Sequence, residues 1–579
     1  MGAALRLACT ALVGGCGRWS ARKQLLGLAL ALLLPAWSAP ANAQRPQGVV
    51  VTEEFEAKAA QRNRRSSAPI NLPKFADTGS AAATAPLFKL KSVSVVGDRA
   101  IPRKEIVNSY ANYIGRSVSQ KDLGDISAAV TSLYRDKGFA LSRAFFPPQD
   151  IDNGRIQLKV VEGYVEEASI EALDDDWLIA REMLAEVKEE RPTRLRTLER
   201  AMLLVADIPG MRIKDASITE IGNGTGRFRL RVKADFQRVG ANVEFDNRGS
   251  RDVGPWQNFT SAWFNSVATR GDTLVINAAT VPSSPRQLMY IGSVYDAPLG
   301  SQGLRAGVRV SYSQGWPDGW QGLVDTRTQT QDYLTYVSYA ALRSRDVSLR
   351  LSTAMGFRNS DEGDNIGPTY SDRVRTISAG ADLQFNDRLR GSNSITVTGR
   401  HGLSWLSASD SDPNSSRANA PSDFAKVTFI ASRYQPIAGP FSLSLSAAGQ
   451  ASSAPLLKSE SLFFGGSQFG RAFAPGSIYG DSGVAGLAEL RFDQHLGLEV
   501  AKAYQLYGFI DRGILWTRGY DFQSLSSAGG GLRLLLNDSL RAGFEIATSI
   551  DTGGLFEQET RFYVSLARAF KNCDRAWCN

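Results

Sequence analysis

The feature that most constrains the fold of this chain is a repeated pattern that extends from about Ala241 to Phe570. About sixteen runs of roughly ten residues alternate apolar and polar side chains, and a turn or loop rich in Gly, Asp, Asn, Ser and Pro follows each run. In the last run Phe562, Val564 and Leu566 share one face, which Arg568 interrupts near its end. Because every backbone N–H inside a bilayer must pair with a neighbouring strand, this pattern predicts a transmembrane β-barrel of about sixteen antiparallel strands.

The first residues predict export from the cytoplasm. A basic stretch around Arg22 precedes the apolar run Leu25–Trp37 and the small residues Ala41–Ala43. This order is typical of a secretory signal peptide at residues 1–43, with cleavage before Gln44. The apolar run is shorter than the roughly twenty residues of a membrane anchor, which disfavours that alternative.

The composition argues against an enzyme and against a nucleic-acid-binding protein. The chain has two histidines, His401 and His495, which we expect to be barrel side chains. Because the sequence also lacks a Gly-x-Ser-x-Gly motif, we expect no catalytic site, no metal site and no cofactor. The 66 basic residues are spread among 58 acidic ones without a long basic run, so polar loops and a solvated lumen explain the charge better than nucleic acid does.

Residues 44–86, between the signal peptide and the first folded unit, divide into two parts. Glu53–Arg62 is predicted to form a short amphipathic helix, with Thr52 as its N-cap and acidic residues in its first turn. A disordered leader is the alternative. Ser66–Ala85 is rich in Ser, Ala, Pro, Thr and Gly, which is typical of a flexible linker.

Two units of similar length follow, and both have the element order β-α-α-β-β. In residues 87–164 the pattern predicts a strand at Phe88–Val96, helices at Pro102–Tyr113 and Ser119–Lys137, and strands at Ala140–Pro147 and Gly154–Val161. In residues 165–236 it predicts a strand at Val165–Ala172, helices at Trp177–Lys188 and Thr193–Val205, and strands at Met211–Glu220 and Gly226–Ala234. Two such modules ahead of a barrel resemble polypeptide-transport-associated (POTRA) domains. One unrelated periplasmic α+β domain is the alternative.

The barrel is assigned to residues 237–570. Its strands are predicted to begin near Gly240, Phe259, Asp272, Gln287, Gly303, Tyr333, Asp346, Arg373, Ser394, Phe424, Phe441, Gly483, Ala503, Ala528, Arg541 and Arg561. Their number is even, as a bacterial single-chain barrel requires. The longest connection is Gln450–Ser482, and the others expected to be long and outside the cell are Trp316–Asp332, Asn359–Asp372 and Ser407–Asp423.

The longest connection holds the motifs by which the chain resembles a known family. It contains Phe463–Phe473, which reads Phe-Phe-Gly-Gly-Ser-Gln-Phe-Gly-Arg-Ala-Phe, and Gly480–Gly483 follows. One strand later comes Phe509–Gly513, which reads Phe-Ile-Asp-Arg-Gly. Together with the two POTRA-like modules, these motifs resemble the Omp85 superfamily and, within it, the TpsB transporters of two-partner secretion, the ShlB/FhaC/HecB type.

The resemblance implies how this loop is held. In TpsB proteins the loop folds back into the lumen, and an arginine at its tip meets the aspartate of a Phe-x-Asp-x-Gly motif on the barrel wall. Carried over to this chain, Arg471 is the arginine and Asp511 the aspartate, and a bidentate pair between them would dock the loop. The neighbouring positions of the loop and wall motifs are Phe469, Gly470, Ala472 and Phe473, and Phe509 and Gly513. Ala472 stands where the family has glycine, which leaves the geometry of the tip open. A solvated arginine in an external loop is the alternative.

Two further matches lie near the ends of the barrel. Phe245–Ser250 is similar to the Asp-Asn-x-Gly-Ser turn of the first TpsB barrel strand, although an ordinary hairpin turn is an equal explanation. Phe570 stands where related barrels have the terminal phenylalanine of their assembly signal. Residues 571–579 follow as a tail, in which Cys573 and Cys578 form either a small disulfide loop or two free thiols.

The resemblance predicts an outer-membrane transporter that exports an unfolded partner protein. Its POTRA modules, in the periplasm, would recognise the partner by strand addition. The helix at Glu53–Arg62 resembles the TpsB plug helix, which would occlude the resting pore together with the Arg471 loop. The expected partners are a secreted TpsA-like adhesin or cytolysin, outer-membrane lipid and the barrel-assembly machinery. The alternatives are an Omp85-type insertion factor, which usually carries more POTRA modules, and a passive porin, which needs none.

Overall fold

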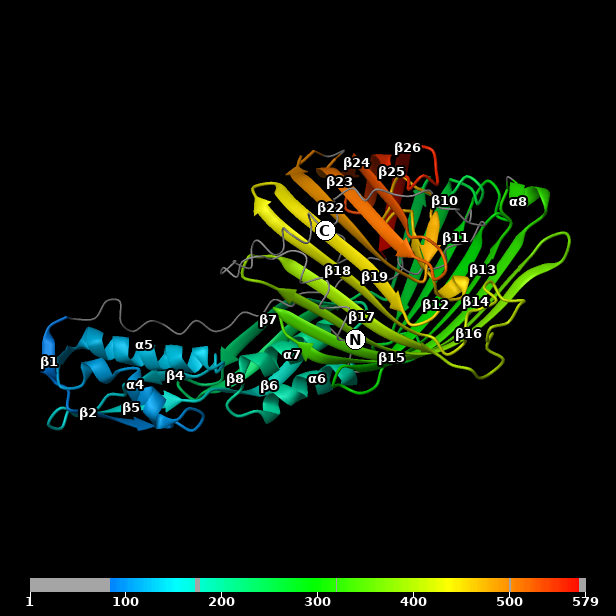
Figure 1. The fold of residues 1–579 in the computed structure, drawn as a ribbon. Helices are drawn as coiled ribbons and strands as arrows, with labels where there is room; N and C mark the ends of the chain where they lie inside the picture. The colour runs from blue at the N-terminus through cyan, green and yellow to red at the C-terminus, as the bar shows by residue number, and fades with distance from the viewer. Residues whose placement is uncertain (1–83, 172–176, 319, 499–500, 572–579) are drawn as a thin grey trace, which may run out of the picture.

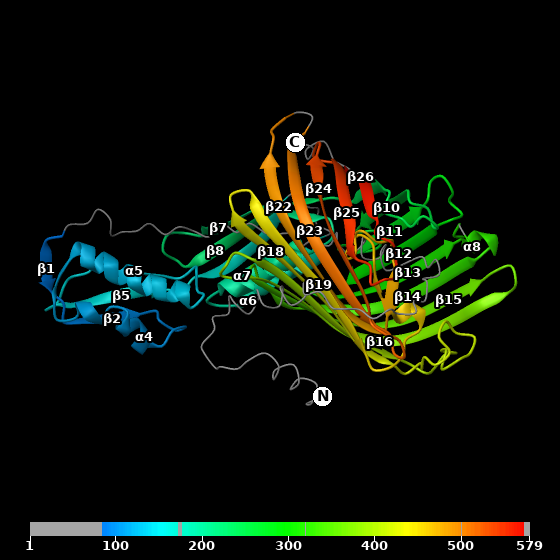
Figure 2. The same cartoon turned by 45° about the horizontal axis from the view of Figure 1, so that its top comes forward.

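The computed structural model describes residues 84–171, 177–318, 320–498 and 501–571. Figure 1 shows two α+β modules in a row, followed by a wide barrel. Figure 2 shows the same order after a turn of 45° about the horizontal axis. The predicted signal peptide, the helix expected at Glu53–Arg62 and the two cysteines of the tail lie outside the described residues.

The first module contains two small sheets packed with its helices. Its elements are β1 Pro86–Lys89, β2 Ser92–Val96, α4 Arg103–Asn108, η1 Ala111–Tyr113, β3 Ser117–Ser119, α5 Gln120–Asp136, β4 Arg143–Phe145 and β5 Arg155–Val161. One sheet has the order β2-β5-β4, with β2 parallel to β5, and the other pairs β1 with β3. The single strand expected at Phe88–Val96 is therefore wrong. It divides at Leu90, which is fully buried and whose backbone bonds to Arg116 O and Gly115 N instead of continuing one ladder.

Helix α5 shows how local sequence sets an element of this module. Ser119 is its N-cap and Asp122 completes a capping box, with Asp122 N donating to Ser119 Oγ over 3.2 Å and Ser119 N donating to the Asp122 carboxylate over 2.7 Å. The Ser119 hydroxyl also donates to the Asp122 carboxylate over 2.6 Å, and this bond, together with the one from Ser119 N, lowers the pKa of Asp122. Ile126, Val130 and Tyr134 follow at helical spacing and are fully buried, so this face of the helix lies in the core.

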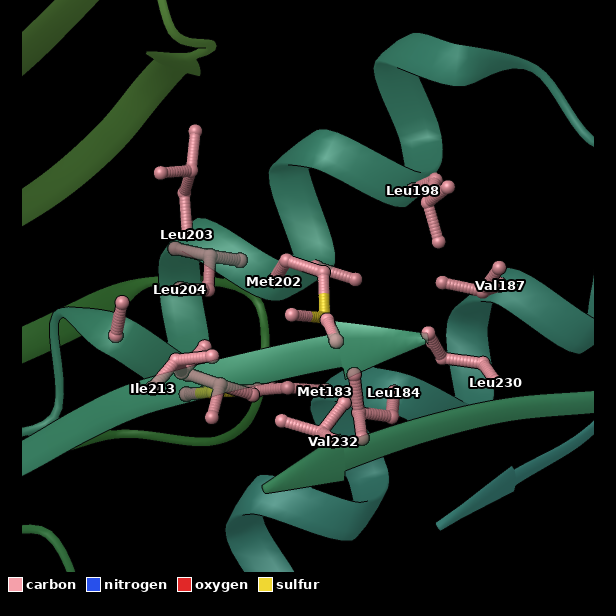
Figure 3. Packing of buried hydrophobic residues seen from close by; sticks show 14 of the residues in the cluster. Met183, Leu184, Val187, Leu198, Met202, Leu203, Leu204, Ile213, Leu230 and Val232 are labelled. Carbon is pink, nitrogen blue, oxygen red and sulfur yellow. The ribbon is translucent and has the colours of Figure 1, made fainter. Parts of the chain in front are cut away.

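The second module has one sheet and two helices, in the predicted β-α-α-β-β order. Its elements are β6 Tyr164–Glu171, α6 Leu178–Glu189, α7 Leu195–Ala206, β7 Met211–Glu220 and β8 Arg227–Phe236, with the sheet order β6-β8-β7. Figure 3 shows the core, in which Leu198 and Met202 of α7 lie over Leu230 and Val232 of β8.

Among the described residues, no helix is long and apolar enough to cross a membrane.

Sixteen antiparallel strands form one closed barrel, in which the last strand pairs with the first. They are β9 Val239–Asp246, β10 Gln257–Asn265, β11 Thr273–Thr280, β12 Met289–Pro298, β13 Leu304–Gly315, β14 Arg327–Arg343, β15 Val347–Gly363, β16 Pro368–Asn386, β17 Ser392–Gly402, β18 Ala425–Ala438, β19 Phe441–Ser452, β22 Ser482–His495, β23 Ala503–Trp516, β24 Gln523–Leu535, β25 Leu540–Asp551 and β26 Thr560–Lys571. The predicted strand number and order are confirmed. The long loop expected at Asn359–Asp372 is wrong, because β15 and β16 continue through it and leave only residues 364–367 between them.

Exposure along β26 confirms the predicted alternation. Phe562 is 69% exposed and its neighbour Tyr563 is 6% exposed. Val564 and Leu566 are exposed on the same face as Phe562, as is Phe570, which pairs with Ala241 of β9. Apart from Arg568, the outward face is therefore apolar and suited to lipid, while the inward face carries the side chains that line the lumen.

The second module packs against the turns at one end of the barrel. Leu204 of α7 and Ala340 of β14 belong to the same buried cluster. Nearby, the guanidinium of Arg343 donates to both oxygens of Asp207, over 2.7 and 2.8 Å. Arg200 donates to the carbonyl oxygens of Ala340 and Gln302 over 2.9 and 3.0 Å. Apolar packing and a buried bidentate pair thus join this module to the barrel.

Candidate functional site

The connection between β19 and β22 carries the predicted loop motif. It contains the short helix η2 Lys458–Glu460 and two short strands, β20 Leu462–Phe464 and β21 Ile478–Gly480, which pair with each other. Residues 465–477, between β20 and β21, form the tip. The tip contacts side chains on the inward faces of β22 to β26, so the loop folds back into the lumen.

Arg471, at the tip, is buried among acidic and aromatic side chains. Its Nη1 lies 2.8 Å from Glu489 Oε2 and 3.2 Å from Glu545 Oε2. Its guanidinium carbon is 4.4 Å from the centre of the Phe509 ring, within the range of a cation–π contact. Tyr563 of β26 donates from its hydroxyl to the Arg471 carbonyl oxygen over 2.7 Å. The alternative interpretation, a solvated arginine in an external loop, does not fit the burial of this side chain.

Asp511 holds the tip differently from the predicted bidentate pair. Its carboxylate accepts from the backbone N–H groups of Gly470 and Arg471, over 3.0 and 3.3 Å, and from Ser527 Oγ over 2.7 Å. The two motif residues do meet, but the guanidinium extends past Asp511 to Glu489 and Glu545. The short aspartate lies beneath the main chain of the tip, whereas the longer glutamates reach the end of the arginine side chain. The expected bidentate pair between the Arg471 and Asp511 side chains is therefore wrong, and a contact between the tip backbone and the Asp511 carboxylate takes its place.

The glycines of both motifs make room for one aromatic ring. A Cβ at Gly513 would lie 2.1 Å from Cδ2 of Phe464, and one at Gly470 would lie 2.6 Å from Cε1 of the same ring. Gly470 has φ of 76°, a conformation that favours glycine. Ala472 is fully buried and is not among the described residues with positive φ, so the departure from the family pattern falls where alanine fits. Phe473 is buried in the same cluster, and Phe469 packs against it.

The two glutamates connect the tip to several strands. Glu489 of β22 also accepts from Arg491 Nε over 2.7 Å and from Arg533 Nη1 over 2.9 Å. Glu545 of β25 also accepts from Arg248 Nη1 over 3.0 Å and from the Tyr507 hydroxyl over 2.7 Å. Arg471, Glu489, Asp511 and Glu545 are called the tip site below.

Sequence reasoning did not identify Glu489, Glu545 or Tyr563 as part of this site. The available signal was an acid between two apolar neighbours in a predicted strand, as in Phe544-Glu545-Ile546. Such an acid is costly to bury unless a cation meets it. The pattern therefore pointed to a partner, but it did not say which one.

The root of the loop is anchored to the wall formed by β15 to β18. Glu460, at the end of η2, is 2% exposed; its carboxylate lies 2.9 Å from Arg400 Nη1 and 2.7 Å from Lys426 Nζ. Arg358 Nη1 donates to the Ser459 carbonyl oxygen over 2.9 Å. Arg358, Arg400, Lys426 and Glu460 are called the root site below.

The turn after β9 links the first strand of the barrel to the last one, β26. The side-chain amide of Asn247 donates to Phe562 O over 2.9 Å and accepts from Val564 N over 2.8 Å. It therefore takes the place of a backbone amide and extends the pairing of β9 with β26. Arg248 lies over the Tyr563 ring, 4.5 Å from its centre. The segment forms the turn between β9 and β10, and it also reaches the tip site through Arg248 and Glu545.

Comparisons with known proteins match both parts of the chain. Residues 88–163 match the ShlB-type POTRA domain, and residues 226–534, just over half of the chain, match the haemolysin secretion/activation protein family ShlB/FhaC/HecB. The heme/hemopexin transporter protein HuxB of Haemophilus influenzae is 21% identical over 507 residues, which cover 83% of this chain and 87% of HuxB. The outer membrane transporter CdiB of Dickeya dadantii is 24% identical over 469 residues, or 77% and 79% of the two chains.

Solved structures share the fold. CdiB from Escherichia coli superposes with a TM-score of 0.71 at 20% identity, covering 90% of this chain and 98% of that one. CdiB from Acinetobacter baumannii has a TM-score of 0.63 at 16% identity, covering 90% and 97%. These similarities show that the chain shares the fold of these proteins, two modules followed by a barrel.

Proposed function

This chain belongs to the haemolysin secretion/activation protein family ShlB/FhaC/HecB, and from that premise we propose that its long loop closes an export conduit. The protein is an outer-membrane transporter of two-partner secretion, with its POTRA modules in the periplasm. The tip site keeps the loop across the lumen in the resting state. Release of the tip opens the barrel to an unfolded partner protein.

The observation that carries this proposal is the burial of the loop's charges against the wall. Glu489 is fully buried and Glu545 nearly so, and both meet Arg471. A charge pair in such a place binds strongly only while its geometry is complete, because each partner alone would be a buried, unpaired charge. The docked loop is therefore held by a contact that is either made in full or lost, which suits two discrete states.

The proposal is tested by removing either half of the tip contact. In Arg471→Ala the loop loses its guanidinium, and in Asp511→Ala two tip N–H groups lose their acceptor. We expect both variants to insert into the outer membrane at the parent level and to secrete little or no partner protein, because a tip without a fixed docked position cannot be switched by partner binding from a docked to a released state. Secretion is measured by immunoblotting of the culture medium, and insertion by heat-modifiable migration of the barrel.

A matched control separates the tip from a general loss of lumen charge. Arg350 lies on β15, and its guanidinium is 3.5 Å from Ser338 Oγ, away from the tip site. Arg350→Ala should leave secretion unchanged. Normal secretion by both tip variants would remove the role assigned to this contact.

We also propose that the POTRA modules capture the partner by strand addition. The sheets β2-β5-β4 and β6-β8-β7 have outer strands whose backbone groups can pair with an extended chain. Deleting Leu87–Phe236 should abolish specific export and leave an ion-conducting barrel. Continued specific export by that deletion variant would contradict capture by the modules.

The remaining contacts of the transporter follow from the same premise. We propose a secreted TpsA-like adhesin or cytolysin as the exported partner, lipid against the exposed apolar face, and recognition of Phe570 by the barrel-assembly machinery. Glu53–Arg62 remains a predicted plug helix that adds to the closure.

A further inference from the structure

The root site holds two cations that face each other across neighbouring strands. Arg400 of β17 and Lys426 of β18 are direct partners in the strand register. Like charges at directly opposed positions destabilise a sheet, and the cost increases with burial. Lys426 is 7% exposed, so water does little to screen it. An anion between these two cations would therefore stabilise this part of the wall.

The chain supplies that anion from the loop. The Glu460 carboxylate lies between the two cations, and Lys426 Nζ also donates to the Glu460 carbonyl oxygen over 2.7 Å. Arg358, on nearby β15, binds the adjoining Ser459 carbonyl and pairs with Asp332 at 2.7 Å. Glu460 is therefore the carboxylate that balances Arg400 and Lys426 in the closed state.

We propose that Arg358, Arg400 and Lys426 form a carboxylate-binding site in the lumen wall, which Glu460 occupies at rest and acidic side chains of the exported chain occupy during transport. The inference rests on the proposed function, because the loop must leave the lumen to free the site. Once Glu460 is withdrawn, Arg400 and Lys426 lack the carboxylate that they hold here. An extended chain passing this wall offers carboxylates that replace Glu460 at little cost in ordering the site, because the site is already formed.

The direct test uses a full chain in which a Gly-Ser-Gly linker replaces residues 454–480. The short linker suffices because Gln450 and Gly483 are register partners on adjacent strands. The protein is inserted in planar bilayers, and poly-L-glutamate is added on the POTRA side. In this background Arg400→Gln should raise the half-blocking concentration about tenfold, the effect of losing one hydrogen bond between charged groups.

Two controls isolate the site from the overall charge of the pore. Arg350→Gln removes the same charge from β15, on the same inward face as Arg358. The strand register places Arg400 level with Ala354, so Arg350 is about 13 Å along the strands and two strands, about 10 Å, away from Arg400. The substitution should change the half-blocking concentration by less than about twofold, as expected for a distant charge screened by salt. Block by poly-L-lysine should not weaken in Arg400→Gln. Equal shifts for Arg400→Gln and Arg350→Gln, or no shift for either, would overturn the proposal.

A second variant covers the case in which the shortened chain does not insert. In the full-length chain, Glu460→Gln keeps the shape of the side chain and removes the competing charge, so poly-L-glutamate should bind more tightly, and adding Arg400→Gln should cancel the gain. No gain in Glu460→Gln would count against the site. The shortened chain has no loop, so its block by poly-L-glutamate measures binding at the lumen wall alone. Secretion by Arg471→Ala measures closure of the barrel by the loop. The two ideas can therefore fail separately.

Discussion

The second α+β module and the long loop are both docked on the barrel, but they are held by different kinds of contact. The module places Leu204 against Ala340 in a continuous apolar cluster and adds the pair of Arg343 with Asp207. The loop has an aromatic cluster as well, but its position in the lumen depends on buried carboxylates that several cations share.

This difference suggests why one contact is permanent and the other reversible. Apolar surface has no competing partner in water, so a packed interface gains free energy in proportion to the area it buries. Buried charges exchange one counter-charge for another, and a passing polypeptide supplies such charges. On the function proposed above, the molecule joins its second module to the barrel by packing and closes its pore by electrostatics.

The largest effect is expected from Glu489→Ala. The substitution leaves Arg471, Arg491 and Arg533 without their shared carboxylate, and removing one partner of a buried ion pair costs about 3–5 kcal/mol. We expect the loop to undock and the open probability of single channels in planar bilayers to rise strongly. Asp382→Ala removes another barrel carboxylate, which accepts from Thr396, and should leave the open probability low. A closed channel in Glu489→Ala would show that packing alone holds the loop.

A comparable but separate effect is expected from Leu204→Ala. Leu204 is 3% exposed, and truncation of a buried leucine costs about 2–5 kcal/mol. Hydrogen exchange should become faster in α7, while the closed-channel conductance stays at the parent level. Leu178→Ala, at a position 65% exposed, is the matched control and should change neither quantity. If Leu204→Ala opened the channel, the two docking sites would not be independent.

Gly513→Ala should have a smaller effect on the loop. The added Cβ would lie 2.1 Å from the Phe464 ring, and overpacking of this kind costs about 1–3 kcal/mol. The open probability should rise, but less than in Glu489→Ala. Gly508 lies on the same strand, and there the nearest atom to an added Cβ is 3.8 Å away, so Gly508→Ala should behave as the parent. Equal opening in both variants would contradict the ring contact.

The smallest effect is expected from Asp122→Asn, which weakens the cap of α5 and should cost about 1 kcal/mol. Because the pKa of Asp122 is lowered in the fold, the charged form stabilises the module. That stabilisation is complete above the unfolded pKa of about 3.9 and is lost as the pH falls through the folded pKa. Hydrogen exchange of α5 should therefore differ between variant and parent near pH 7 and converge in strong acid. Asp125→Asn, in the same helix, is the control.

The sequence predicted the elements better than the contacts between them. Strands and helices follow from local periodicity, so all sixteen barrel strands and the helices of both modules were found in the right order. The strand at Phe88–Val96 failed because its division is caused by burial of Leu90 against a distant segment. The loop expected at Asn359–Asp372 is wrong because the ends of these two long strands are rich in polar residues, a composition that is also typical of a loop.

The sequence by itself determined the barrel, the two modules, and the pair of motifs that meet at Arg471 and Asp511. Only the tertiary structure decided that the guanidinium goes to Glu489 and Glu545, and that Glu460 lies between Arg400 and Lys426. The physical reason is the distance along the chain over which each property is determined. Alternation with period two is a property of each strand alone, whereas the charges that face one another across a lumen depend on register, closure of the barrel and the course of a loop through it.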